Sequence, residues 1–174
     1  MRRLNQAFVF VVFACLQAVG ALAQDTPEGT VSTETFDSWN LTCVTRSDRR
    51  TCEINQNIAD ASGSPLMQLQ VGTFNSNGTD ITMLARFPVN ITTTMPIIWS
   101  AGDISVGLTL RACFQSICVA DGPISDDVAA SLLRTDTEAR TRFTITRADG
   151  VTASVPLSLT GFSDAWTAML ERTR

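Results

Sequence analysis

Residues 39–55 read WNLTCVTRSDRRTCEIN, and their alternation decides the fold. Apolar residues recur at every second position on both sides of a polar stretch, which is typical of a β-hairpin with one buried face. Pairing Cys43 with Cys52 sets Leu41 opposite Ile54, so both apolar sets share that face. Directly opposed Cα atoms lie about 4.5–5.5 Å apart, which a disulfide accepts. We therefore predict a Cys43–Cys52 disulfide packed on the core.

A second cysteine pair fits the same geometry. A two-residue turn at residues 115–116 sets Cys113 against Cys118. Alternation along the preceding strand places Leu110 and Ala112 on the apolar face and Cys113 on the other face. The Cys113–Cys118 disulfide is therefore expected nearer to solvent.

Two further hairpins have Gly at the end of the turn. Three-residue loops at 76–78 and 148–150 bring the apolar residues of their flanking strands onto one face. Such loops need Gly in the left-handed region at their last position. Hairpins spaced in this way predict a mainly β fold, an antiparallel β-sandwich or a partly open barrel.

Two short helices are expected to interrupt the strands. Ser125 can cap a helix that runs to about Leu133, with acidic residues in its first turn. Ser163 opens the second helix, with Phe162 before it as a hydrophobic staple. The buried stripe expected on this second helix consists of Trp166, Met169 and Leu170.

The N-terminus has the pattern of a cleaved signal peptide. Arg2 and Arg3 precede an apolar run over residues 7–16, and small residues follow up to Ala23. We predict cleavage between Ala23 and Gln24. The run is shorter than the ~20 apolar residues of a transmembrane helix.

The competing interpretation of this N-terminus is a lipoprotein signal that would acylate Cys15. Phe13 is bulky for such a site, and the hydrophobic region continues past the cysteine, so ordinary cleavage is favoured. Residues 24–35 are polar and are expected to form a disordered leader before a single β-rich domain over 36–174.

Four cysteines remain after cleavage, and an even number in an exported chain predicts two disulfides. Their number alone allows three connectivities, among which the hairpin registers select. Zinc is the alternative ligand for four cysteines. The C-x8-C and C-x4-C spacings and the export signal favour disulfides.

Composition excludes many chemistries. The chain contains no His, Lys or Tyr, so Ser-His-Asp catalysis, an imidazole metal site, a Schiff base and a P-loop lysine are excluded. The mature chain of 151 residues has 11 arginines against 17 acidic groups, a net charge of −6. This acidity argues against binding to nucleic acid or to an anionic membrane surface, and no later segment is long enough for an integral membrane span.

Several acidic residues are candidates for chemistry. Asp121, Asp126 and Asp127 could hold calcium, although turn and capping roles account for them as well. Asp37 beside Trp39 is the best candidate for one acid of a glycan-cleaving pair, which requires two acids across a cleft.

Arginines crowd the tip of the first hairpin, where an anionic partner could dock. They are Arg46, Arg49 and Arg50. Because Asp48 lies among them in the sequence, solvated turn charge is the favoured interpretation.

Taken together, these landmarks resemble the invasion-associated locus B family of bacterial envelope proteins. The resemblance covers nearly all of residues 36–170. The residues that carry it are Phe36-Asp37-Ser38-Trp39 and Cys43; Cys52, Ile54 and Gln56; Cys113, Cys118 and Ala120; and Leu157-Ser158-Leu159-Thr160-Gly161-Phe162. The sequence departs from the family pattern at Ile117, where the resemblance implies Gly.

The resemblance implies an exported protein, periplasmic or secreted or associated with the outer membrane, whose founding members are linked to host-cell entry. It brings no catalytic, cofactor-binding or metal-binding residue. We therefore expect a non-enzymatic module that binds a protein or surface partner through an apolar patch or a free sheet edge. The alternatives are a carboxylate-dependent enzyme acting on envelope glycans and a structural periplasmic protein.

Overall fold

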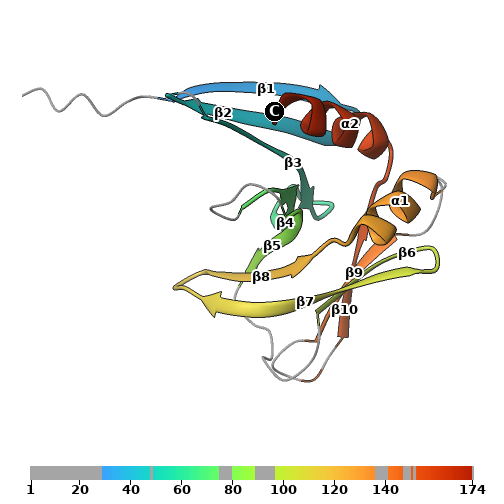
Figure 1. Cartoon of the computed structure of the whole chain (residues 1–174). Coiled ribbons are helices and arrows are strands. Elements are labelled where there is room, and N and C mark those ends of the chain that lie inside the picture. The colour runs from blue at the N-terminus through green and yellow to red at the C-terminus, as the bar shows by residue number, and fades with distance from the viewer. Residues whose placement is uncertain are drawn as a thin grey trace, which may run out of the picture.

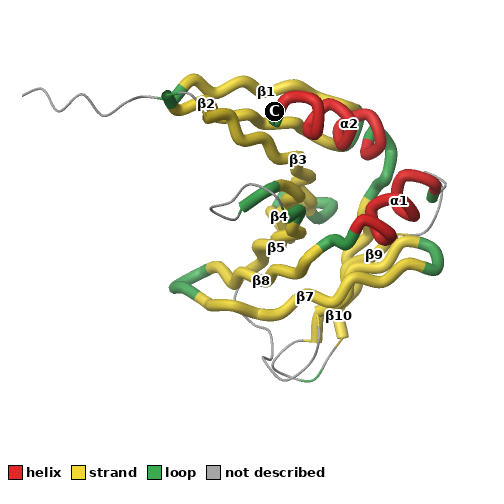
Figure 2. Tube along the Cα trace, viewed as in Figure 1, coloured by secondary structure: helices red, strands yellow, loops and turns green. Residues whose placement is uncertain are grey.

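The computed structural model describes residues 29–47, 49–74, 80–88, 97–135, 141–146, 150 and 152–173. Within these residues strands predominate, and two helices lie against them (Figure 2). Along the chain the elements are β1 (Thr30–Phe36), β2 (Trp39–Arg46), β3 (Arg49–Ala59), β4 (Pro65–Gly72), β5 (Thr82–Pro88), β6 (Ile97–Ala101), β7 (Ile104–Cys113), β8 (Ile117–Pro123), α1 (Asp126–Arg134), β9 (Thr141–Thr146), β10 (Thr152–Leu157) and α2 (Phe162–Arg172).

The described strands form one antiparallel sheet in the order β1-β2-β3-β4-β5-β8-β7-β6-β9-β10. The sheet curls into a half-barrel and leaves β1 and β10 at its two edges (Figure 1). Phe87 on β5 and Phe143 on β9 lie 6.2 Å apart between ring centroids, although three strands separate β5 from β9 in the sheet. The predicted mainly β, antiparallel fold is confirmed, in its partly open form.

The hydrophobic core fills the concave face of this sheet. Alternate residues of β2, β5, β6 and β8 are buried, and Trp99, Leu69 and Ala85 are each 0% exposed. Helix α2 closes the β1–β3 end of the concave face (Figure 1). Its buried residues are Phe162, Ala165, Trp166 and Met169, whereas Leu170, predicted to be buried, is 40% exposed.

The hairpin registers follow the apolar alternation. Leu41 lies opposite Ile54 across β2 and β3. Phe143 lies opposite Val155 across β9 and β10, which is the register that a three-residue loop requires. Gly150 has a φ of +82°, the left-handed conformation expected at the end of such a loop. The loop at 76–78, most of the loop at 148–150 and the signal peptide with its Ala23–Gln24 cleavage site lie outside the described residues.

The predicted disordered leader is wrong over its second half. Residues 30–35 belong to strand β1, which pairs along its whole length with β2. The side chains of β1 are almost all exposed, so no apolar pattern marks it in the sequence. Backbone pairing and the β-propensity of its Thr and Val residues stabilise it instead.

The two helices differ in how well their starts were predicted. Ser125 caps α1, and its Oγ accepts a hydrogen bond from the Val128 backbone N–H at 3.4 Å. Helix α2 begins one residue earlier than expected, at Phe162, and its cap is Gly161 without a side-chain hydrogen bond. Phe162 is therefore the first residue of α2, where it packs on Trp39, and not a hydrophobic staple that precedes the helix.

A β-bulge near the end of β7 changes the environment of the second disulfide. Leu110 lies opposite Ala120 and Ala112 opposite Val119, so Arg111 is the extra residue. By this register Ala112 shares the face of Val119, and Cys113 shares the face of the buried Cys118 although Cys113 itself is exposed. Cys113 is exposed, whereas Cys118 and both cysteines of the first disulfide are buried, so the Cys113–Cys118 disulfide lies nearer to solvent, as expected, but through Cys113 alone.

Candidate functional site

Two sequence motifs far apart in the chain meet where α2 joins the sheet. The indole Nε1 of Trp39 donates to the Ser158 carbonyl at 2.9 Å. The buried Gln56 amide donates to the carbonyls of Ser158 (3.0 Å) and Ser38 (3.3 Å) and accepts from the Ser158 N–H (3.2 Å). The Phe162 ring meets Trp39 edge-on at 5.0 Å. These residues hold α2 on the sheet, so their role is structural.

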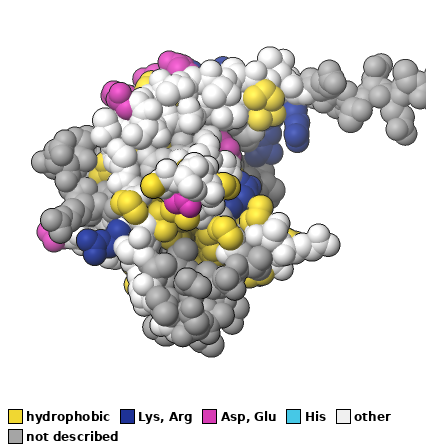
Figure 3. All heavy atoms as spheres, turned by 180° about the vertical axis from the view of Figure 1, so that it is seen from behind, with side chains coloured by type: hydrophobic (Ala, Val, Ile, Leu, Met, Phe, Trp, Pro, Cys, Tyr) yellow, Lys and Arg dark blue, Asp and Glu magenta, His cyan; other side chains and the backbone are white. Residues whose placement is uncertain are grey.

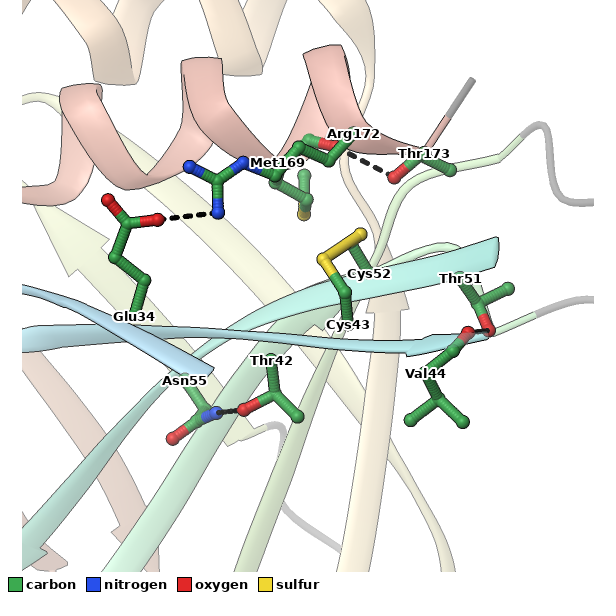
Figure 4. The surroundings of a disulfide bond; sticks show 10 residues. All are labelled: Glu34, Thr42, Cys43, Val44, Thr51, Cys52, Asn55, Met169, Arg172 and Thr173. Carbon is green, nitrogen blue, oxygen red and sulfur yellow. Dashed lines mark hydrogen bonds and ion pairs between the residues drawn. A yellow bond between two sulfur atoms is a disulfide. The ribbon is translucent and has the colours of Figure 1, made fainter. Parts of the chain in front are cut away.

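The first disulfide supports the same region. Cys43 and Cys52 are joined at 2.09 Å between β2 and β3, and both are buried. Figure 4 shows the sulfur atoms pointing toward α2, with Met169 above them. Glu34 of β1 and Arg172 of α2 form an ion pair at 2.5 Å beside it. The disulfide joins β2 to β3, and the ion pair joins β1 to α2.

The acidic candidates are not assembled into a metal site. Asp121 pairs with Arg111 across β7 and β8, and Asp126 and Asp127 are exposed in the first turn of α1. In the described ranges, no group of three or more His, Cys, Asp or Glu side chains is placed to hold a metal ion.

Asp37 is a turn residue. It is exposed between β1 and β2 with a φ of 49°, a left-handed conformation that Asp tolerates better than most residues. Its Cβ lies 3.1 Å from where a side chain on Gly161 would begin. Asp37 therefore has a structural role in the turn that links β1 to β2.

The outer face of the sheet carries a chain of polar side chains across β3, β4 and β5. Arg86 Nη1 donates to Gln68 Oε1 at 3.0 Å and also to Gln70 Oε1. Gln68 Nε2 donates to Asn57 Oδ1 at 3.0 Å, and Gln70 Nε2 donates to Glu53 Oε1 at 2.7 Å. We call these five residues the polar ladder.

Glu53 is the acidic end of the polar ladder. Partial burial raises the pKa of its carboxyl, while the hydrogen bond from Gln70 and the charge of Arg86 act in the opposite direction. Because desolvation is the largest of these effects, the fold disfavours the charged form of Glu53.

An apolar groove of about 490 Å³ lies beside the other end of the polar ladder, where β3 turns into β4. Asp60 shapes the turn, since its Oδ1 accepts from the backbone N–H groups of Ser62 (2.8 Å) and Ser64 (3.0 Å). The rear view shows hydrophobic side chains gathered near the centre of the face (Figure 3). The apolar side chains that line the groove include Ile58, Pro65, Leu66, Met67, Phe87 and Ile117.

The tip of the β7–β8 hairpin extends this apolar surface. Phe114 is 66% exposed there, and Ile117 and Leu66 are 45% and 37% exposed. Arg86 and Ile117 line both the apolar groove and the neighbouring hollow beneath Phe114. Three exposed large hydrophobic side chains around a groove are typical of a docking surface.

The arginines of the first hairpin are divided between the two faces of the sheet. Arg46 lies directly opposite Arg49 on the outer face, whereas Arg50 lies opposite Thr45 on the other face. Asp48 lies outside the described residues. Arg46 and Arg49 line a second hollow of about 620 Å³.

The fold defines a class of protein: an open β half-barrel with two local disulfides and a C-terminal helix over one end. The family model for the invasion associated locus B (IalB) protein matches residues 39–170, and the chain belongs to this family. Comparison with curated protein sequences gives no match. None of the helices in the described ranges is long and apolar enough to cross a membrane.

A solved structure has the same fold. The crystal structure of invasion associated protein B from Bartonella henselae superposes with a TM-score of 0.66 at 17% sequence identity. The match covers 80% of this chain and 95% of that chain. At 17% sequence identity this similarity shows that the two proteins share a fold, and nothing more.

The polar ladder and the apolar groove were missed in the sequence. The outward positions of β3 and β4 hold Asn55, Asn57, Gln68 and Gln70, a run of amides at alternate positions that could have indicated a hydrogen-bonded row. The groove has no such pattern, because it is formed by strand ends brought together by the sheet order.

Proposed function

We propose that this protein is an exported, non-enzymatic interaction module that binds apolar side chains of a protein partner in the apolar groove. The observation that carries the proposal is the groove itself, with Leu66, Phe114 and Ile117 exposed around it. Burial of such side chains against a partner stabilises a complex by about 25 cal/mol per Å² of apolar surface. Arg86 at the groove wall adds hydrogen-bonding capacity at the rim.

We place the protein in the periplasm or outside the cell. The two disulfides support an oxidising compartment, and the N-terminal segment has the pattern of a signal peptide. The Bartonella henselae protein is named for an association with invasion, and contact with a host cell is the corresponding setting proposed for this chain. Edman sequencing of the exported protein should begin at Gln24.

Site-specific photo-crosslinking in the native cell tests the docking surface. A photoreactive residue at Phe114 should give a defined adduct with a partner protein. The matched control is Val31 on β1, which is also apolar and 61% exposed but lies at the sheet edge. The same reactive group at Val31 should give no such adduct.

Substitution within the groove completes the test. Ile117→Asp and Leu66→Asp should abolish the Phe114 adduct, because each places a charge where the partner buries apolar surface. Circular dichroism and thiol titration should show an unchanged fold, since both side chains are exposed. Equal adducts from Phe114 and Val31, or an adduct that survives both substitutions, would contradict the proposal.

A further inference from the structure

The two disulfides differ in how open they are to attack from solvent. Cys113 is exposed, whereas Cys118 and both cysteines of the first disulfide are buried. A thiolate breaks a disulfide by attacking one of its two sulfur atoms, so access to a single sulfur is sufficient. In the folded protein, exchange is therefore directed to Cys113, and Cys118 is the leaving sulfur.

The first disulfide is protected by the surrounding structure. Cys43 and Cys52 lie within the regular pairing of β2 and β3, with three further residue pairs between them and the turn. Met169 of α2 lies above the two sulfur atoms (Figure 4). A reductant reaches such a bond after local opening of the sheet or the helix, which slows the reaction. The first disulfide is therefore a control within the same molecule.

The end of β7 that carries Cys113 is held by few contacts. Beyond the β-bulge, two residue pairs join β7 to β8, and the second disulfide forms one of them. A backbone hydrogen bond from the Phe114 N–H to the Ile117 carbonyl closes the turn at 2.8 Å. Strand β8, in contrast, is paired with β5 along its whole length. Loss of the disulfide therefore loosens the end of β7 and the turn but leaves β8 in place.

The reduced protein needs no buried charge. Cys118 lies opposite Phe87 of β5, and both side chains are buried. A neutral thiol is compatible with such an apolar position, since cysteine is among the residues most often buried. The fold can therefore persist after reduction, with Cys118 as a buried thiol and Cys113 as an exposed one.

The residues enclosed by the second disulfide form part of the rim of the apolar groove. Phe114 and Ile117 lie between the two cysteines and are 66% and 45% exposed, and Ile117 lines the groove. A rim that is already ordered loses less conformational entropy when a partner binds. The disulfide therefore favours docking, and its reduction disfavours docking.

We propose that Cys113 is a site of thiol–disulfide exchange for a thioredoxin-like dithiol protein, and that reduction loosens the rim of the apolar groove. A thiolate of the dithiol attacks Cys113 Sγ and forms a mixed disulfide. The electron pair of the broken bond leaves on Cys118 Sγ, which takes a proton. The second thiol of the reductant then displaces Cys113, so the dithiol is oxidised to a disulfide and the protein gains two thiols. Weaker partner binding by the reduced form rests, in addition, on the proposed function of the groove.

Timed reduction of the folded mature chain by dithiothreitol tests the exchange site. Free thiols are alkylated at each time and located by peptide mass spectrometry. The second disulfide should be reduced at least about tenfold faster than the first, because the first must open locally before it reacts. Circular dichroism checks that the fold is retained. Equal rates for the two disulfides, or faster reduction of the first, would overturn the proposal.

Single variants identify the sulfur that is attacked. Cys118→Ala leaves Cys113 as an exposed thiol, and Cys113→Ala leaves Cys118 as a buried one. With Ellman's reagent the Cys113 thiol should react at least about a hundredfold faster. A thioredoxin whose second active-site cysteine is replaced by serine should trap the wild-type protein as a mixed disulfide through Cys113. A mixed disulfide through Cys118, or no mixed disulfide, would contradict the assignment.

Hydrogen–deuterium exchange tests the effect on the rim without a partner. The double variant Cys113→Ala, Cys118→Ala represents the reduced form, and the Phe114 amide should exchange about tenfold faster in it than in the wild type. The matched control is Cys43→Ala, Cys52→Ala, which should leave exchange at Phe114 unchanged. Unchanged exchange in the first double variant would overturn the proposed loosening of the rim.

The photo-crosslink at Phe114 separates this proposal from that of the partner. In the double variant Cys113→Ala, Cys118→Ala, the yield of the adduct should fall about threefold, because the rim is less ordered before binding. An adduct of equal yield in both proteins would overturn the consequence for docking. Absence of the adduct in the wild type would contradict the proposed partner, whereas the reduction rates and the deuterium exchange still decide whether Cys113 is the exchange site.

Discussion

Gly161 is the residue on which the attachment of α2 depends. Its φ of +82° lies in the left-handed region, and a Cβ there would be 2.1 Å from the Phe36 carbonyl oxygen. Gly161→Ala should therefore lower the free energy of unfolding by at least about 3 kcal/mol, from backbone strain and from displacement of the β1–β2 turn. Urea unfolding followed by tryptophan fluorescence measures the loss.

Gly150 provides the matched control. It has the same φ of +82°, but no residue in the described part of the chain lies within 4 Å of where its Cβ would be. Gly150→Ala should cost only the conformational part, about 1 kcal/mol. Equal losses in the two variants would show that the contact with Phe36 contributes nothing.

Glu53 should make stability depend on pH in a direction opposite to that of most carboxylates. Because burial raises its pKa in the fold above 4.5, the stability associated with the protonated form is complete below pH 4.5. That stability is lost as pH rises through the raised pKa. Glu53→Gln cannot ionise and can still accept the hydrogen bond from Gln70, so it should be more stable than the wild type at neutral pH.

The measurement is a series of urea unfolding curves from pH 2 to pH 8 for both proteins. The difference between them should widen with pH and then level off. Asp60→Asn is a control of opposite sign, because hydrogen bonds from Ser62 and Ser64 lower the pKa of Asp60. The stability from Asp60 is present above pH 3.8 and lost as pH falls through the lowered pKa. A constant difference between wild type and Glu53→Gln would contradict the role of burial.

The two disulfides should differ in what they contribute. Replacing Cys43 and Cys52 by Ala removes a cross-link from the unfolded chain and leaves space under Met169, so the loss should be about 3–4 kcal/mol. Replacing Cys113 and Cys118 by Ala removes less buried packing, because Cys113 is exposed, and the loss should be about 2 kcal/mol. Urea midpoints of the two double variants measure the difference, and a larger loss for the second pair would refute the ranking.

Hairpins could be predicted from the sequence because their information is local. Alternation in β2 and β3 has one register that puts Leu41 and Ile54 on a common face, and the structure has that register. Arg111 shows the limit of this reasoning. A bulge changes the face of every later residue, and nothing in the composition of β7 marks where it falls.

Strand β1 and the candidate sites could not be predicted for a different reason. The side chains of β1 bury almost nothing, so its formation depends on backbone pairing with β2. The apolar groove joins the β3–β4 turn to the β7–β8 hairpin through the pairing of β5 with β8. Contacts of this range follow from the sheet order, which alternation alone does not give.

The half-barrel separates residues that maintain the fold from residues available for binding. Trp39, Gln56 and Phe162, which carry the family resemblance, are buried at the junction with α2. The apolar groove lies instead where β3 turns into β4. Ile117, where the family pattern implies Gly, lines the groove. Substitutions on the outer face can therefore change binding while the core remains intact.

An open sheet also predicts a gradient of stability from its edge to its centre. Among the described strands, β1 pairs with β2 alone and buries little more than part of Phe36. Strand β4 is paired on both sides, and its Leu69 and Val71 are fully buried. Amides of β1 should therefore open without global unfolding and exchange with deuterium about a hundredfold faster than those of β4, a difference of ~3 kcal/mol.

Hydrogen–deuterium exchange read by mass spectrometry or NMR measures both strands in one experiment. Glu34→Gln removes the ion pair with Arg172 and should speed exchange in β1 while leaving β4 unchanged, because that pair joins β1 to α2. The expected effect is small, about two- to threefold, since both side chains are partly exposed. Equal protection of β1 and β4 in the wild type would mean that the β1 edge is covered in solution, and the free-edge description would then be wrong.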